Sequence, residues 1–105
     1  MDKRYKPLSL HDEILLRERA IAEVLAHPEW SLAECLRHLR SGLRMTSAEL
    51  AKLAGVGHRT LQDLEQGRSE GSVQTYNRIL RLLGLKLGVV RVDQRFIDSD
   101  ASKVI

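Results

Sequence analysis

The chain has only one cysteine, Cys35, so it cannot form an intrachain disulfide. It also has no apolar run as long as a signal peptide or a membrane span, and aromatic residues make up only 4% of it. These absences argue against a disulfide-stapled secreted domain and a membrane protein, and the cytoplasm is the expected compartment. The 105 residues suffice for one compact domain, whose formal charge of +3 permits nucleic-acid binding.

The sequence offers no group of side chains suited to catalysis or to a structural metal site. No nucleophile, general base and orienting group occur as a set, so no enzyme activity is expected. Cys35 and His38 lie one helical turn apart, but a structural metal site needs about four such ligands and there is no partner cluster. We therefore expect no metal and no cofactor, and we interpret Cys35 as a buried thiol.

Capping signals divide most of the chain into five predicted helices. A serine or threonine is followed three residues later by an acidic residue at Ser9, Ser31 and Thr46, a pattern typical of helix starts. Glycine, which tolerates the left-handed conformation that often follows a helix, stands at the expected ends. Together with apolar residues at helical spacing, these signals predict helices over residues 9–27, 31–42, 46–55, 57–67 and 72–83.

The pattern changes after Gly84, where alternating apolar residues predict a β-strand over 85–92. A lone strand needs a partner, and the sequence offers no second strand nearby, so we expect it to pair with the same strand of a second copy. The alternative is an extended tail lying on the chain's own helices. The residues assigned to the dimer strand are Leu85, Leu87, Val89 and Val90.

The predicted organisation therefore has four parts. A lead-in and an extra N-terminal helix occupy residues 1–30, a helical domain occupies 31–84, a dimerisation strand 85–92 and a polar tail 93–105. The fold class is all-α, with five helices and one C-terminal strand that pairs across a homodimer.

Two short helices joined by a tight glycine turn can hold one helix rigidly for insertion into the major groove of DNA. Ala51 is the small residue at the helix crossing, Gly55 is the turn, and the apolar residues that hold the pair together are Leu50, Val56, Leu61 and Leu64. The segment T-S-A-E-L-A-K-L-A-G-V-G-H-R-T-L-Q-D-L-E-Q-G resembles the motif of the Cro and lambda-repressor-like family. The resemblance extends from about Leu36 to Leu83.

The resemblance implies a recognition helix that begins near His58. Its base-contacting positions match His58, Arg59 and Asp63, and Gln62 lies on or near the same outward face. Helical geometry agrees, because Leu61 and Leu64 point the other way.

The family's phosphate contacts match Thr46, Ser47, Gln66 and Arg68, and a structural pair matches Arg40 and Glu65. The sequence departs from the family at Ser47, where glutamine is common, and at Asp63, whose charge repels phosphate. Asp63 is expected either to accept a hydrogen bond from cytosine or to orient Arg59.

The function expected from these features is that of a homodimeric transcriptional repressor which reads a palindromic DNA operator. An alternative is an antitoxin that binds a toxin protein and represses its own operon, because a strand after the last helix is similar to antitoxins of this family. A third possibility, a protein-interaction adaptor that does not bind DNA, would require the acidic residues to dominate the surface.

Overall fold

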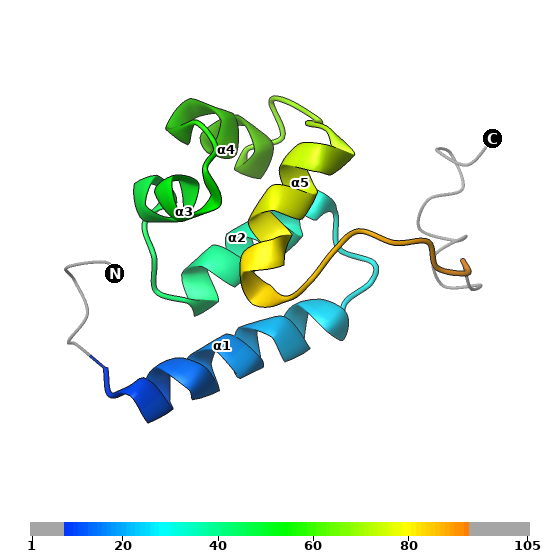
Figure 1. Cartoon of the computed structure of the whole chain (residues 1–105). Coiled ribbons are helices and arrows are strands. Elements are labelled where there is room, and N and C mark those ends of the chain that lie inside the picture. The colour runs from blue at the N-terminus through cyan, green and yellow to red at the C-terminus, as the bar shows by residue number, and fades with distance from the viewer. Residues whose placement is uncertain (1–7, 93–105) are drawn as a thin grey trace.

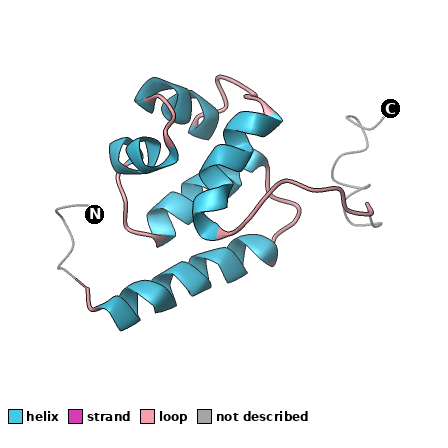
Figure 2. Ribbon diagram, viewed as in Figure 1, coloured by secondary structure: helices cyan, strands magenta, loops and turns pink. Residues whose placement is uncertain are grey.

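The computed structural model describes residues 8–92, and all regular structure within that range is helical (Figure 1, Figure 2). The predicted five helices are confirmed there, with ends within a few residues of those expected. They are α1 (Leu10–Leu25), α2 (Leu32–Gly42), α3 (Ser47–Ala54), α4 (His58–Glu65) and α5 (Val73–Leu80), which continues as a 3-10 turn over Arg81–Leu83. The predicted lead-in before residue 8 and the tail from 93 to 105 lie outside the described residues.

The helix starts follow the capping signals in the sequence. The side chains of Ser9, Ser31 and Thr46 each accept a hydrogen bond from the backbone N–H three residues later. At Thr46 the box is reciprocal, because the Glu49 carboxylate also accepts from the Thr46 backbone N–H at 3.0 Å. These bonds satisfy amides that have no partner inside the helix, which is why the boundaries could be read from the sequence.

A continuous apolar core joins α2, α3, α4 and α5. Leu36 from α2 and Leu61 and Leu64 from α4 are at most 1% exposed, and they pack with residues of α3 and α5. The remaining buried members of this cluster are Leu50, Ala51, Ala54, Tyr76 and Ile79. This core fixes α4 against the other three helices and leaves only its opposite side facing solvent.

Helix α1 lies along the lower edge of the molecule, beneath α2 and α5 (Figure 1). Its single buried residue is Ala20, which joins Leu39 and Leu80 in a second, smaller cluster. The close approach requires glycine on α2, because a Cβ at Gly42 would lie 2.9 Å from the Cβ of Ala20. Two small residues thus allow α1 and α2 to pack with their backbones close together.

Much of the apolar surface of α1 is not covered. Leu10, Ile14, Leu15 and Leu25 are 48 to 74% exposed. The N-terminal half of α1 also forms one wall of an open, mostly apolar groove of about 520 Å³, whose other walls come from the α2–α3 connection, α3 and the 3-10 turn. None of the helices in residues 8–92 has the length and apolar character needed to cross a bilayer.

The strand predicted over 85–92 is not formed in the single chain, where the segment is extended and has no ladder of hydrogen bonds (Figure 2). Leu85 and Leu87 pack against the chain's own core instead, and the Leu87 N–H donates to the Asn77 side-chain oxygen at 2.7 Å. At Leu85 and Leu87 the alternation of apolar residues therefore reflects burial against the chain's own helices. Val89 and Val90, further along, are 102% and 72% exposed.

Substituting Gly42 by alanine should loosen the packing of α1 on α2. The added methyl group meets the rigid Cβ of Ala20, and overpacking of this kind costs about 1–3 kcal/mol, partly offset by a gain in helix propensity of up to about 1 kcal/mol. Urea denaturation should show a net loss of about 1 kcal/mol in unfolding free energy. Gly88→Ala is the matched control, since a Cβ there meets no atom within 4 Å. Equal stabilities of the two variants would contradict the close α1–α2 contact.

Candidate nucleic-acid interface

Helices α3 and α4 form a rigid pair joined by a tight turn. The turn begins at Gly55, whose φ of 70° lies in the left-handed region that glycine adopts without strain. The Arg78 side chain donates to the Gly55 carbonyl at 3.3 Å, so α5 helps to hold the turn. The pattern of α3 and α4 predicted this turn, whereas the contribution of Arg78 was missed because it comes from a distant helix.

The outward side of α4 carries the side chains assigned to base contacts. Leu61 and Leu64 on its inner side are fully buried, whereas His58 and Arg59 are exposed, the Arg59 side chain by 86%. Gln62 and Asp63 are partly buried. The structure thus brings the four predicted residues together on one helix, with Arg59 the most accessible of the charged ones.

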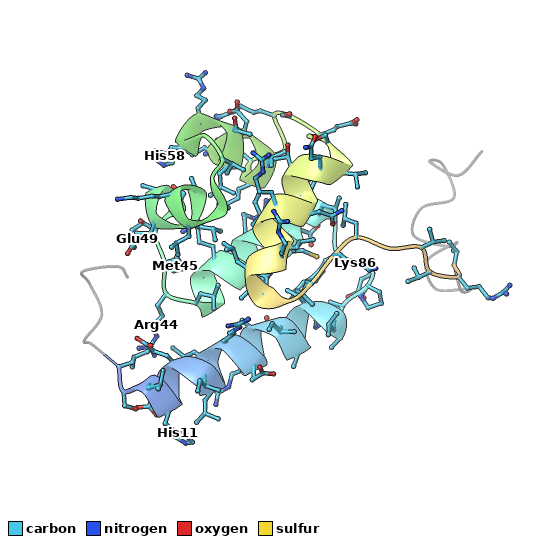
Figure 3. The ribbon with its side chains drawn as sticks, viewed as in Figure 1. His11, Arg44, Met45, Glu49, His58 and Lys86 are labelled. Atoms are coloured by element: carbon cyan, nitrogen blue, oxygen red, sulfur yellow. The ribbon has the colours of Figure 1, made fainter. Side chains whose placement is uncertain are left out.

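The beginnings of α3 and α4 are linked by a side-chain hydrogen bond. Ser47 Oγ lies 2.9 Å from His58 Nε2, and Figure 3 shows His58 at the start of α4 beside α3. Ser47 stands where glutamine is common in the family, and its short side chain pairs with His58. This contact fixes the His58 ring at the edge of the outward face.

Three of the predicted phosphate contacts already have intramolecular partners: Ser47 pairs with His58, and Thr46 and Arg68 pair with carboxylates. The Thr46 hydroxyl accepts from the Glu49 N–H at 3.1 Å and lies 3.0 Å from the Glu49 carboxylate, to which it donates. Arg68 is held by Asp63, as described below. Gln66, directly after α4, is exposed and has no such contact in the described part of the chain.

Arg40 and Glu65 form an ion pair at the base of the interface. Arg40 Nε lies 2.9 and 3.0 Å from the two carboxylate oxygens of Glu65, whose side chain is only 5% exposed. Arg40 also donates to the Met45 carbonyl at 3.2 Å, and the Arg37 guanidinium donates to the Glu65 carbonyl. Helix α2 therefore holds the C-terminal end of α4 through two arginines, of which sequence reasoning identified one.

Asp63 is paired chiefly with Arg68 and only weakly with Arg59. Arg68 Nη2 and Nε lie 2.8 and 2.9 Å from Asp63 Oδ1, whereas Arg59 Nε lies 3.9 Å from Oδ2. Asp63 was expected to orient Arg59, but its closer partner is Arg68. The pattern of residues did not predict the Asp63–Arg68 pair, because Arg68 reaches the carboxylate only when the loop after α4 turns back onto the helix.

Residues 8–92 hold no cluster of three side chains of the types that ligate metal ions. Cys35, which was expected to be a buried thiol, is only partly buried. This partial burial raises the pKa of its thiol, and the neighbouring carboxylates of Glu34 and Glu29 raise it further. His38 instead stacks on Trp30, with ring centroids 4.0 Å apart. His27 stacks on Trp30 as well, at 4.1 Å, so the indole ring joins the end of α1 to α2.

The buried ion pair predicts a difference in stability between two arginine variants. Arg40→Ala leaves the Glu65 carboxylate buried without its main partner, which should lower the unfolding free energy by about 3–5 kcal/mol. Arg59→Ala removes an exposed side chain and should change it by less than about 0.5 kcal/mol. Thermal denaturation followed by circular dichroism compares the two, and equal melting temperatures would count against a stabilising role for the pair.

A comparison with known protein families identifies the part of the chain that contains these helices. A family model described as a helix-turn-helix domain matches residues 31–92, from the cap of α2 to the end of the described chain. No match was found among curated proteins or among solved structures. The matched segment spans more than half of the 105 residues and leaves α1 outside it. The chain therefore belongs to the helix-turn-helix domain family.

Proposed function

We propose that this protein is a sequence-specific double-stranded DNA-binding regulator of the Cro and lambda-repressor-like type, which represses transcription as a dimer. The observation that carries the proposal is the division of α4 into two sides. Leu61 and Leu64 are fully buried, while His58 and Arg59 project from the same two turns into solvent. A helix fixed in this way can enter the major groove, which is wide enough to admit it.

Arg59 is the residue best suited to read a base. Its guanidinium can donate two parallel hydrogen bonds to the O6 and N7 atoms of guanine. The side chain is 86% exposed and its nearest carboxylate oxygen is 3.9 Å away, so little interaction has to be lost on binding. His58, held by Ser47, is the second candidate at the same end of the helix.

The beginning of α3 and the end of α4 supply the groups for phosphate contact. Backbone N–H groups at a helix start favour an anion, and Ser47 is the first residue of α3. Gln66 follows α4 and is exposed. Contacts of this kind position a protein on DNA without reading sequence, whereas the outward residues of α4 read the base edges.

We also propose that the segment after Leu87 forms the dimer contact. Val89, Val90 and Val92 are 53 to 102% exposed, and their backbone groups make no ladder within the described chain. Pairing with the same segment of a second copy would satisfy the backbone groups and bring the valines of the two copies into contact. A twofold axis there would present two α4 helices to half-sites about 34 Å apart on a palindromic operator.

Replacing Arg59 by alanine should weaken binding to the preferred operator by about 1–3 kcal/mol and relax selectivity at one base pair. The measurement is fluorescence anisotropy with an operator selected from random duplexes, repeated at several salt concentrations. Arg19→Ala removes the same charge from the exposed surface of α1 and should leave operator affinity nearly unchanged. A wild-type protein with no salt-sensitive affinity for any duplex would overturn the proposed function.

Replacing Val90 by lysine should shift the monomer–dimer equilibrium toward monomer, because it adds a like charge to both of the paired segments. Sedimentation equilibrium should show at least a tenfold weaker dimer, which corresponds to about 1.4 kcal/mol. Val73→Lys, at a similarly exposed position on α5, should leave the equilibrium unchanged. A wild-type chain that stays monomeric while bound to its operator would contradict this dimer contact.

A further inference from the structure

Asp63 is the one acidic side chain on the outward side of α4, and it lies between two arginines. Its Oδ1 is 2.8 Å from Arg68 Nη2, and its Oδ2 faces Arg59 at 3.9 Å. The Asp63 side chain is 26% exposed and the Arg68 side chain is 54% exposed, so both are accessible to a ligand. A carboxylate at this place repels DNA phosphates unless it pairs with a cation or accepts a hydrogen bond from the DNA.

The backbone holds the Asp63–Arg68 pair in place. The Asp63 carbonyl accepts from the N–H groups of Arg68 at 2.9 Å and Ser69 at 3.3 Å, and the turn between them passes through Gly67 with a φ of 72°. The loop is thus closed back onto the helix at the residue that supplies the carboxylate. The pair is a built feature of the end of α4 and its loop.

We propose that Asp63 determines specificity by exchanging partners on the operator. This inference rests on the proposed DNA-binding function. Away from the operator Arg68 stays on the Asp63 carboxylate, which occupies it in place of a phosphate. On the operator a base amino group takes the place of Arg68 on Asp63, and the released guanidinium binds a DNA phosphate.

The chemistry of the base edges limits where this exchange occurs. A carboxylate only accepts hydrogen bonds, and the base groups that donate in the major groove are the amino groups of cytosine and adenine. Guanine and thymine present acceptors there, so the exchange would leave the carboxylate facing negative partial charge. The operator should therefore carry cytosine or adenine opposite Asp63, and the phosphate contact of Arg68 is made only when that base is present.

The exchange also weakens binding to other sequences. Lysine and arginine contacts to phosphate supply most of the sequence-independent affinity of DNA-binding proteins. Keeping Arg68 on Asp63 removes one such contact from every complex in which the correct base is absent. Asp63 thereby raises the ratio of operator affinity to random-sequence affinity.

The test uses the full chain with Asp63→Asn and Arg68→Gln, alone and combined. Asp63→Asn should raise affinity for a random-sequence duplex about fivefold, the effect of one released surface pair, and should steepen its salt dependence by about 0.9 in log–log slope. Binding-site selection should lose the preference for cytosine or adenine at one position. Arg68→Gln should weaken operator binding more than random-sequence binding and should reduce the operator slope by about 0.9.

Glu70→Gln is the control, because it makes the same change of charge two residues from Arg68 at an exposed side chain with no ion pair inside residues 8–92. It should change random-sequence affinity by less than about twofold, as expected for an exposed charge. Equal effects of Glu70→Gln and Asp63→Asn, or an undiminished Asp63→Asn effect in the Arg68→Gln background, would overturn the exchange while leaving DNA binding intact. If the wild type shows no salt-dependent affinity for any duplex, both the exchange and the proposed DNA-binding function are wrong.

Discussion

The buried carboxylate of Glu65 is the point on which the position of α4 depends. A charge in the interior is costly unless it is paired, and here both of its oxygens accept from Arg40 of α2. Arg40 also reaches the Met45 carbonyl, and Arg37 reaches the backbone of Glu65 itself. The end of α4 is therefore fixed relative to α2 and to the connection that leads into α3. Apolar packing of Leu61 and Leu64 brings the helices together, and the directional ion pair sets where α4 ends.

The outward face follows from this constraint. Because the inner side and the C-terminal end of α4 are held, the side chains that remain exposed are those of its first turn and of the loop that follows it. Arg59 is almost fully accessible, whereas Arg68 is engaged by Asp63. Two arginines close to one helix thus stand in different states, since one is accessible and the other is paired with a carboxylate.

Helix α1 is held by close packing of small residues and by ring stacking. Its contact with α2 depends on two small residues, Ala20 and Gly42, and on the stacking of Trp30 between His27 and His38. Four large apolar side chains of α1 remain exposed, so this helix contributes less to the core than its composition suggests. It lies beneath α2 and α5 in Figure 1 and leaves the outward side of α4 uncovered.

The helices and the place of the turn could be predicted from the sequence, because capping bonds and glycine conformations are local and involve residues only a few positions apart. The sequence also predicts which side of α4 faces outward, because burial follows helical periodicity. The packing of Leu85 and Leu87 on the chain's own helices becomes visible only in the folded chain, since alternation cannot tell a partner strand from a helical surface. The same holds for the role of Arg37, which lies 28 residues before Glu65 in the sequence. Such contacts depend on which loops and helices meet, and local patterns carry no information about that.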